Sequence, residues 1–483
     1  MEEAILVDIL TPDLCVIGAG SGGLAVAEAA RAHGASVVLV ERDRLGGNNL
    51  NTGTIPAKAL GAAAANTRAI RTASAFGIGA EEPKVNFRKL HDHLEQTVLN
   101  LAPQSAAPRY QALGAEIVKG EARFIDKRTL AAGDVQIRAH RFVIATGGRP
   151  VVPTIMGLDA VPFFTTETIF DNTRKLTHLA IIGAGRLGLE LGQAYARLGT
   201  QVTVIDNGTP LAGTDPDLAY LALRRLEEEG VAIRANTNVL TIHGRSMGIG
   251  VVIRAAEDEE VLDVSHILVA AGRLPNIHNL DLDKAGIRRL KLDADRLQLS
   301  PSLRTSNRRV YAIGDAAGGA PSAQAARYQA RLVVRSALFG LQARQEPHLV
   351  PVVTYTDPEI AEIGLNEAMA RDQLGDRFRV TRWSFADNDA ARAARQTFGA
   401  AKLITDRAGR ILGAGIVGER AGELIALFSF AIANKLSTRH LGRFVASYPS
   451  FSEIAGRLGD AAGHSVPPSP LLKQWMTLVR LFG

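Results

Sequence analysis

The sequence predicts an α/β fold made of two similar halves followed by a smaller α+β module, and three observations support this prediction. A glycine-rich loop occurs twice, each time between a short apolar run and a helix-like stretch. In both copies a β-branched strand then ends in an acidic residue at the same distance from the loop. Beyond about residue 345, four strand-like runs separated by turns replace this pattern. Each half therefore has the element order of a Rossmann-like dinucleotide-binding domain.

The composition is that of an ordinary folded protein. The chain has 483 residues, enough for about three domains of roughly 150 residues each. Because 46% of the residues are hydrophobic and 22% are charged, disordered, collagen-like and coiled-coil proteins are excluded. The formal net charge is +6 and contains no basic block, so we expect no nucleic-acid partner.

Cysteine usage and the apolar segments bear on the compartment. Cys15 is the single cysteine, so no intramolecular disulfide can form, and its apolar neighbours predict a buried, unreactive thiol. No basic segment precedes an apolar stretch after Met1, and no apolar run reaches about 18 residues. We therefore expect a cytoplasmic protein without a secretory signal or a membrane span.

The two loops fit the pattern G-x-G-x-x-G, as Gly18–Gly23 and as Gly183–Gly188. Such a loop brings backbone N–H groups close to a pyrophosphate at a helix N-terminus. The acids that end the following strands are Glu41 and Asp206, where a carboxylate reaches a ribose hydroxyl. One loop alone would be weak evidence, because glycine-rich turns are common. Two copies with one spacing predict two dinucleotide sites, formed by Gly18, Gly20, Gly23 and Glu41 and by Gly183, Gly185, Gly188 and Asp206.

The second acid also indicates which nucleotide binds. Asp206 is followed by Asn207 and Gly208 and not by basic residues. A carboxylate at this position repels a 2′-phosphate, which usually requires an arginine. The sequence therefore favours NADH over NADPH at the second site, with NADPH as the alternative.

The expected domain boundaries follow the repeated pattern. Each half closes with a strand and a turn, Thr146–Pro150 in the first and Ala271–Pro275 in the second. A third strand, Val310–Ile313, leads into Gly314-Asp315 and places a carboxylate at the carboxyl end of a sheet. We expect a first domain from residues 1–150 and 276–344, a second from 151–275, an α+β domain from 345–463, and a linker with a terminal helix at 464–483.

The terminal segment predicts an amphipathic helix after the proline-rich linker Pro467–Pro470. Helical spacing places apolar residues on one side and polar residues on the other; these are Leu471, Leu472, Trp475, Leu478, Val479 and Phe482, opposite Lys473, Thr477 and Arg480. Two interpretations stay open for residues 471–482. The helix docks on its own or a partner subunit, or it contacts a membrane surface peripherally.

The combination of motifs resembles a known flavoprotein family. Besides the two loops, the chain has Ala-Thr-Gly-Gly-Arg-Pro, Ala-Ala-Gly-Arg-Leu-Pro-Asn and Ala-Ile-Gly-Asp. It resembles the class I pyridine nucleotide-disulfide oxidoreductases, the family of dihydrolipoamide dehydrogenase and mercuric reductase, over residues 12–460. The details Tyr355–Ile360 and Ile363–Leu365 look closest to the mercuric-reductase-like branch.

The resemblance implies roles for several residues. It implies that the first loop and Glu41 bind FAD, that Asp315 contacts the ribitol region, and that the second loop and Asp206 bind NAD(P)H. It implies a homodimer formed through the C-terminal domain. The further cofactor-binding residues that it implies are Gly47, Lys58, Thr146, Gly147, Glu190, Gly272 and Gly314.

The sequence departs from the family where the thiol chemistry is carried out. Asn49 and Thr54 stand where the family has its redox-active cysteines. Tyr448 stands where the catalytic histidine would be, whereas the following Glu453 is retained. A phenol with its ordinary pKa near 10 is a poor general base at neutral pH. The C-terminal cysteine pair of mercuric reductases is also missing, and we expect no metal site.

The residues beside the flavin are nevertheless present. Lys58 and Glu190 match the family residues that form an ion pair next to the reactive edge of the flavin. Flavin reduction by NADH does not need a dithiol, which only carries electrons away afterwards. We therefore expect catalytic roles for Lys58 and Glu190, and for Asn49, Thr54, Tyr448 and Glu453 on the side that the thiols would occupy.

The predicted function is an FAD-dependent NAD(P)H oxidoreductase of diaphorase type, with NADH preferred. Electrons would pass without a dithiol to a quinone-like or other small acceptor. One alternative is a soluble pyridine-nucleotide transhydrogenase, which resembles the segment Gly53–Pro56 but keeps the first cysteine. A second alternative is a nucleotide-binding flavoprotein that serves in sensing or assembly with little turnover.

Overall fold

The computed structural model describes residues 8–319, 322–464 and 470–482. These residues divide into two compact units. The first contains the chain up to residue 210 together with 229–346, and the second contains 211–228 together with the chain from 347 onward. Both predicted halves have their main sheets in the first unit, and the predicted α+β module lies in the second.

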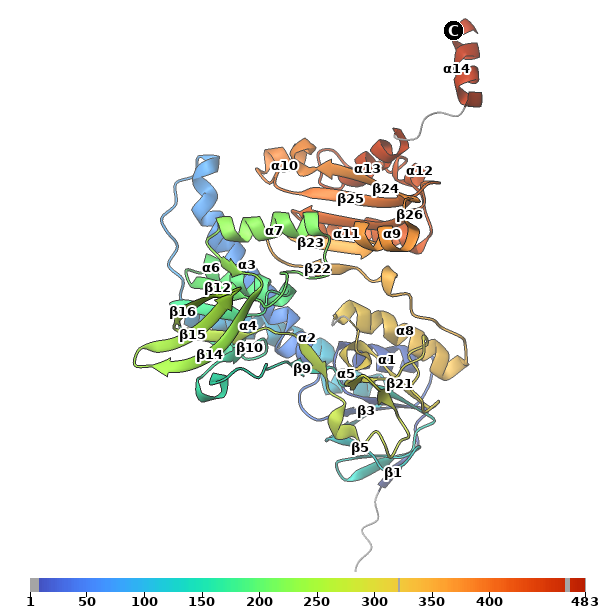
Figure 1. Cartoon of the computed structure of the whole chain (residues 1–483). Helices are drawn as coiled ribbons and strands as arrows, with labels where there is room; N and C mark the ends of the chain where they lie inside the picture. Colours follow the sequence, from blue (N-terminus) through green and yellow to red (C-terminus); the bar gives the residue numbers. More distant parts are fainter. Residues whose placement is uncertain (1–7, 320–321, 465–469, 483) are drawn as a thin grey trace, which may run out of the picture. The chain divides into compact units, whose positions relative to one another are not determined.

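Five parallel strands form the first sheet, in the order β21, β8, β2, β3 and β4; of these, β21 and β3 are labelled in Figure 1. Their bounds are β2 Leu14–Ile17, β3 Val37–Glu41, β4 Ala115–Lys119, β8 Arg141–Ile144 and β21 Val310–Ala312. Alternate residues of β2 belong to two different apolar cores, Leu14 and Val16 to one, Cys15 and Ile17 to the other. The continuous apolar run is thus buried on both faces, as a parallel sheet requires.

Two layers cover this sheet. Helices α1 (Ser21–Ala32) and α8 (Ala323–Phe339) pack against each other over one face. The other face lies against a smaller sheet of β1, β7, β6 and β5, with bounds Asp8–Leu10, Val135–Ile137, Leu130–Ala132 and Ala122–Phe124. Cys15 is fully buried between these layers, and burial raises the pKa of its thiol, which confirms the predicted unreactive cysteine.

The second parallel sheet repeats this arrangement, with the order β10, β17, β11, β12 and β13. The strands are β10 Phe164–Thr165, β11 His178–Ile182, β12 Gln201–Ile205, β13 Ala232–Arg234 and β17 His266–Val269. Helix α6 (Arg186–Arg197) packs on β12, and an antiparallel sheet of β14 (Thr237–Arg245), β15 (Gly248–Ala255) and β16 (Asp258–Val264) contributes to a shared apolar core. The two-half α/β prediction is therefore confirmed.

The remaining elements of the first unit connect these sheets. Strand β9 (Gly148–Pro150) pairs antiparallel with β18 (Arg273–Pro275), so the turns that end the two halves lie side by side. A short hairpin of β19 (Arg289–Leu290) and β20 (Asp293–Leu297) follows. The helices are α2 Gly47–Asn51, α3 Thr54–Thr72, α4 Phe87–Leu101 and α5 Ala107–Ala112.

The second unit is an α+β domain built on an antiparallel sheet of β22, β23, β26, β25 and β24. These strands span Val352–Thr354, Glu359–Gly364, Ile411–Gly418, Ala400–Asp406 and Phe378–Ser384. Its helices are α9 Glu367–Leu374, α10 Asp389–Ala393, α11 Ala421–Ala433, α12 Thr438–Leu441 and α13 Glu453–His464. The buried side of α11 packs on this sheet, as the predicted strand and helix order requires.

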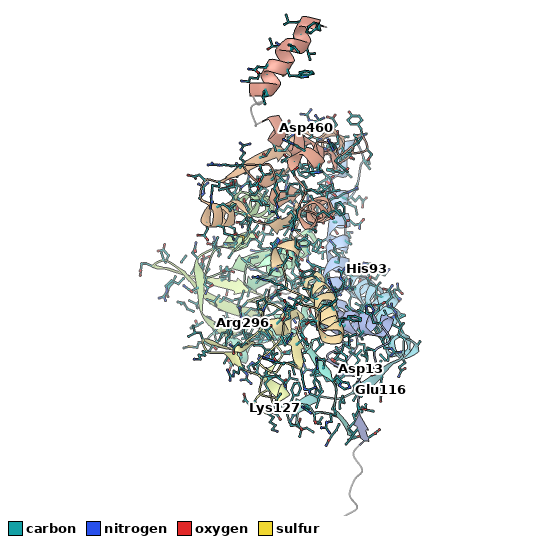
Figure 2. All side chains as sticks on the ribbon, turned by 90° about the vertical axis from the view of Figure 1, so that its right-hand side faces the viewer. Asp13, His93, Glu116, Lys127, Arg296 and Asp460 are labelled. Atoms are coloured by element: carbon teal, nitrogen blue, oxygen red, sulfur yellow. The ribbon has the colours of Figure 1, made fainter. Side chains whose placement is uncertain are left out.

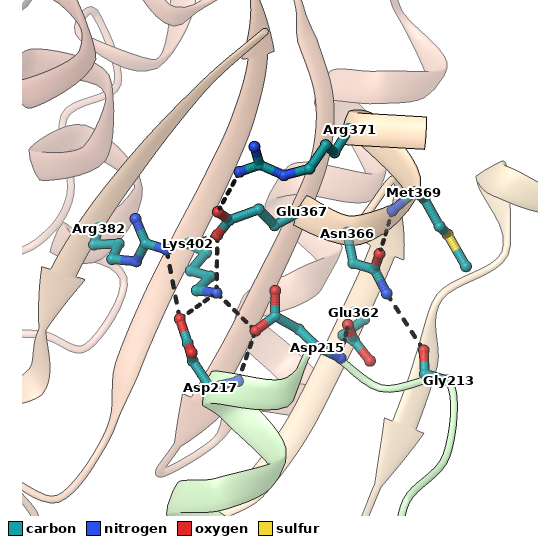
Figure 3. Close-up of polar contacts among 10 residues, drawn as sticks. All are labelled: Gly213, Asp215, Asp217, Glu362, Asn366, Glu367, Met369, Arg371, Arg382 and Lys402. Atoms are coloured by element: carbon teal, nitrogen blue, oxygen red, sulfur yellow. Dashed lines mark hydrogen bonds and ion pairs between the residues drawn. The ribbon is translucent and has the colours of Figure 1, made fainter. Parts of the chain in front are cut away.

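Helix α7 (Pro216–Glu228) belongs to this second unit although its sequence lies between β12 and β13. A charge cluster joins it to the sheet (Figure 3). The Lys402 ammonium, 5% exposed, lies 2.7 Å from Asp215 Oδ1 and 2.6 Å from Asp217 Oδ2. Arg382 contacts Glu367 at 2.6 Å and Asp217 at 3.4 Å. The buried carboxylate of Asp215 is thus neutralised by Lys402, which ties α7 to β25.

The predicted terminal helix is present as α14, Pro470–Phe482 (Figure 1). Most of the proline-rich linker before it lies outside the described residues. Among the described helices, none combines the length and apolarity needed to cross a bilayer.

Candidate active site

The first glycine-rich loop joins β2 to α1 with a backbone that only small residues allow. Gly18 has φ +101°, a conformation that strongly favours glycine, and a Cβ there would lie 2.5 Å from the Ala145 carbonyl oxygen. A Cβ on Gly23 would collide with the carbonyl of Gly18. The Ala19 N–H donates to Glu41 Oε2 at 2.7 Å. The loop is therefore compact, and the carboxylate at the end of β3 is held beside it.

The second loop repeats these features almost atom for atom. Gly183 has φ +115°, and a Cβ on Gly188 would collide with its carbonyl. The Ala184 N–H donates to Asp206 Oδ2 at 2.6 Å, and the Gly208 N–H donates to Asp206 Oδ1 at 2.8 Å. A carboxylate oxygen has further lone pairs, so Asp206 can still accept from a ribose hydroxyl. Both loops thus have the geometry of a site for a dinucleotide at a helix N-terminus.

The donor groups near the first loop fit a flavin nucleotide. Thr146, which follows β8, has a buried hydroxyl without a hydrogen-bond partner among the described residues. Leaving such a group unsatisfied costs about 1–3 kcal/mol, and a ligand bound beside the loop would remove this cost. Gly147 next to it has φ +67°, and a Cβ built on it would meet no atom within 4 Å. The unpaired hydroxyl and the open space at Gly147 are compatible with bound FAD.

The segment with Asn49 and Thr54, at the positions of the family's cysteines, runs from α2 through a short turn into α3. Gly46 and Gly47 have φ +93° and +58°, and Gly46 forms an isolated bridge with Gly20 of the first loop. Asn49 lies half-buried in α2, and Thr54 is the exposed first residue of α3. Lys58 follows one helical turn later and is also exposed, so it shares a face of α3 with Thr54.

Lys58 and Glu190 lie on two helices that pack against each other, α3 and α6. Glu190 is half-buried. The packing brings together the elements that carry the expected ion pair, and the pairing itself stays a prediction.

A chain of polar contacts, which the sequence did not indicate, links Asn48 to Asp315. Asn48 Nδ2 donates to Glu167 Oε1 at 3.0 Å, and Glu167 Oε1 lies 2.9 Å from Arg273 Nη1. Arg273, 15% exposed, also contacts Asp315 Oδ2 at 3.2 Å. Arg273 further donates to the carbonyl of Gly148. Asp315 is therefore held by a cation from the first residue of β18.

The signals for these residues differ. Arg273 was visible in the motif Ala-Ala-Gly-Arg-Leu-Pro-Asn without an assigned role, whereas nothing in the sequence singled out Glu167 or Asn48. Gly272 has φ +120° and its carbonyl accepts from the Val151 N–H at 2.9 Å. Gly314 has φ +63°, and its N–H donates to Gln329 at 2.7 Å. These two predicted residues shape turns around Arg273 and Asp315.

Tyr448 and Glu453 lie in the second unit, where Tyr448 is 72% exposed. Its hydroxyl donates to Asp389 Oδ2 at 3.0 Å, and this hydrogen bond raises the pKa of Tyr448. Glu453 begins α13 and pairs with Arg457 at 3.9 Å. Because the phenol O–H donates its hydrogen bond to Asp389, the phenol oxygen offers only lone pairs to a further partner. Asp389 was not anticipated, since no motif marks it.

Among the described residues, no cluster of three or more His, Cys, Asp or Glu side chains is placed to hold a metal ion.

Comparisons with known proteins agree with this geometry. Residues 12–330 match the family model described as pyridine nucleotide-disulphide oxidoreductase, and residues 350–458 match the dimerisation domain of the same family. The chain is 32% identical to the mercuric reductase of Streptomyces lividans over 448 residues, which cover 91% of this chain and 94% of that protein. It is 31% identical to the dihydrolipoyl dehydrogenase of Bacillus subtilis over 463 residues, covering 93% and 96%.

A solved structure also matches the fold over nearly its whole length. It is the HOCl-induced flavoprotein disulfide reductase RclA from Escherichia coli, with a TM-score of 0.80 and 25% identity. The match covers 93% of this chain and 99% of that one. Two nucleotide loops of one geometry, the C-terminal dimerisation domain and these relatives lead to one conclusion. The chain belongs to the pyridine nucleotide-disulphide oxidoreductases, a family of flavoprotein enzymes that use FAD and NAD(P)H, as a member without the redox-active cysteine pair.

Proposed function

We propose that this protein is an FAD-dependent oxidoreductase that oxidises NADH and reduces a quinone-like acceptor without thiol chemistry. One observation carries the proposal. Both nucleotide loops keep their glycines and their carboxylate contacts, whereas Asn49 and Thr54 occupy the two positions of the family's thiols. Because the sites for NADH and FAD are retained and the dithiol is missing, the reduced flavin would transfer its electrons directly to a small molecule.

The first loop and its neighbours would hold FAD. Gly18, Gly20 and Gly23 leave room for the pyrophosphate at the N-terminus of α1, and Glu41 accepts from the ribose. The Thr146 hydroxyl gains the partner that it lacks within the described chain. Bound FAD supplies a carrier that takes a hydride from one reactant and gives two electrons to another.

The second loop would hold NADH. Asp206 accepts from the unphosphorylated ribose, and no basic residue follows it to neutralise a 2′-phosphate. Lys58 and Glu190 would be held near the flavin edge by the packing of α3 and α6. Their opposite charges would balance the charge that moves during hydride transfer.

Thr54, Asn49 and Tyr448 would form the acceptor side. The exposed Thr54 hydroxyl can donate to a quinone oxygen as that oxygen gains negative charge. Tyr448 would come from the partner subunit of a homodimer formed through the dimerisation domain, and would stay protonated because of Asp389. The overall reaction takes NADH, a proton and a quinone to NAD⁺ and a hydroquinone.

The single cysteine of the protein is buried and reduced, which suits the cytoplasm, and we propose this location for the protein.

The first test is anaerobic stopped-flow mixing of the purified holoprotein with NADH and, separately, with NADPH. We expect rapid flavin bleaching with NADH, slower bleaching with NADPH, and reoxidation on addition of a ubiquinone analogue. Blocking thiols with iodoacetamide is the control, because the native protein should lose no activity when its one cysteine is buried. Absent bleaching would overturn the proposal and favour a sensing or assembly role.

A second arm separates the transhydrogenase alternative. Hydride exchange between NADH and an NADP analogue should be slow compared with quinone reduction. Turnover of dihydrolipoamide, glutathione or mercuric ion should be undetectable, and a normal rate with any of them would contradict the direct-transfer mechanism.

A further inference from the structure

Helix α14 carries an apolar surface that no part of the described chain covers. Leu471 is 78% exposed, Trp475 62% and Phe482 85%. An isolated helix of 13 residues is marginal in water, because few backbone hydrogen bonds offset the cost of ordering it. This helix therefore needs an apolar environment against its exposed face.

Helix α14 has an apolar row and a basic row on opposite sides. Leu471, Trp475 and Leu478 recur at helical spacing, and Phe482 continues the same row. The opposite row contains Lys473, Thr477 and Arg480. This row has two cations, Lys473 and Arg480, and no acidic residue. The Thr477 hydroxyl between them donates to the Lys473 carbonyl at 3.0 Å.

The charged residues of α14 indicate which apolar environment the helix enters. Asp460, in α13, is the last acidic residue of the sequence (Figure 2), and Lys473 and Arg480 are the only charged side chains after it. When the apolar face enters the acyl region, the two cations on the opposite face can reach lipid phosphates. Trp475 adds a ring that prefers the boundary between headgroups and acyl chains.

We propose that α14 binds the surface of an anionic lipid bilayer and lies parallel to it in the headgroup region. At 1.5 Å per residue the helix is about 20 Å long, shorter than the hydrocarbon core of about 30 Å, so it lies on the membrane and does not span it. This partner is independent of the electron acceptor, although a bilayer surface is also where a lipid-soluble quinone is reached.

The experiment is co-sedimentation of the full-length holoprotein with two kinds of vesicles, phosphatidylcholine alone and phosphatidylcholine with phosphatidylglycerol. We expect binding to the anionic vesicles that weakens as salt rises, and weak binding to the neutral ones. In a Trp383→Phe background, Trp475 fluorescence should shift to the blue on binding, which reports burial of α14 itself.

Three variants test the two faces. Lys473→Gln with Arg480→Gln should weaken binding to anionic vesicles about 25-fold, since each basic residue near such a surface contributes roughly fivefold. Trp475→Ser with Leu478→Ser should weaken binding to both vesicle types by about tenfold or more. The matched control Gln474→Ser changes neither a charge nor the apolar row and should bind as wild type.

Two results would overturn the proposal. One is wild-type protein that stays in the supernatant with anionic vesicles at low salt. The other is a change of oligomeric state in the Trp475 and Leu478 variant without any vesicle binding by wild type, which would mean that α14 docks on a second copy of the chain. All variants should keep normal flavin reduction by NADH in solution, so failure of the membrane proposal and failure of the proposed enzyme are separate readouts.

Discussion

The two glycine-rich loops share one backbone design and differ in what surrounds them. In each, the first glycine N–H donates to the end of the next strand, Gly18 to Val40 and Gly183 to Ile205, both at 2.8 Å. The difference lies at the second glycine. Gly20 forms a bridge with Gly46, whereas Gly185 is exposed and a Cβ on it would meet no atom within 4 Å.

This contrast indicates two kinds of ligand. A loop enclosed by a second glycine-rich turn holds its ligand from two sides, which slows dissociation and suits a resident cofactor. A loop that is open to solvent suits a nucleotide that binds and leaves in each cycle. Under the proposed function, the same local chemistry would serve FAD in the first half and NADH in the second.

The largest effect should come from filling the loops. We expect Gly23→Val to give protein without flavin, because the new side chain collides with the Gly18 carbonyl and the loop cannot close around a pyrophosphate. Gly188→Val should retain flavin and lose reduction by NADH more than about 100-fold. Visible flavin absorbance per protein and stopped-flow bleaching measure the two outcomes. Equal loss of flavin in both variants would abolish the distinction between the loops.

The second half also differs because α7, which lies within its stretch of the sequence, belongs to the C-terminal unit. Lys402→Met should destabilise that unit by about 3 kcal/mol, because Asp215 would be left as a buried carboxylate without its cation. Urea unfolding followed through Trp383 of β24 in a Trp475→Phe background measures this. Flavin content of the folded protein should not change, and Arg371→Met, at an exposed contact with Glu367, is the control with little effect.

The same cluster predicts a pH dependence. Hydrogen bonding to Asp215 and Asp217 raises the pKa of Lys402 against the opposing effect of burial, whereas the bond to Lys402 lowers the pKa of Asp217. The lysine contribution is present below its ordinary pKa of 10.5 and is lost as pH rises through the higher folded value. The Asp217 contribution is present above 3.8 and is lost as pH falls through the lower folded value. The stability difference between wild type and Lys402→Met should be flat between about pH 5 and 9 and shrink on both sides.

A smaller effect should follow removal of a single acid. Asp206→Ala should raise the KM for NADH about 10- to 100-fold through loss of a hydrogen bond to a charged group, and should leave flavin content unchanged. Its counterpart Glu41→Ala should weaken flavin retention and leave the KM for NADH of the loaded protein near wild type. If Glu41→Ala raised the KM for NADH as much as Asp206→Ala, the assignment of Glu41 to the flavin site and Asp206 to the NADH site would be wrong.

The smallest effect concerns Tyr448. Since the hydrogen bond to Asp389 raises the pKa of Tyr448 above its ordinary value, the pH profile of quinone reduction should show no ionisation of the phenol near neutral pH. Tyr448→Phe should lower the rate a few-fold without changing the shape of the pH profile. A limb near pH 8 or 9 that disappears in this variant would mean that the phenol acts as a base.

Much of the fold could be predicted from the sequence because its signals are local. The loops require glycine at Gly18 and Gly183, and the runs before and after them are apolar enough to be buried on both faces. The spacing from each loop to its acid is set by one helix and one strand, so Glu41 and Asp206 could be placed without tertiary information. The α+β pattern after residue 345 was equally readable from alternating strands and turns.

Other features depended on packing between segments far apart in the chain. Asn48 and Glu167 are joined by a hydrogen bond across 119 positions, Arg273 and Asp315 across 42, and Tyr448 and Asp389 across 59. Such pairs carry no periodicity, so the sequence could mark Asp315 and Tyr448 but could not indicate their partners.

What the sequence by itself determined was therefore the backbone design: two nucleotide loops, their acids and the loss of the thiols at Asn49 and Thr54. Only the tertiary structure decided that Arg273 holds Asp315, that Asp389 keeps Tyr448 protonated and that α7 joins the C-terminal sheet through Lys402. The physical reason is that short-range sterics and spacing act within a few residues, whereas the pairing of polar side chains follows from which elements pack together.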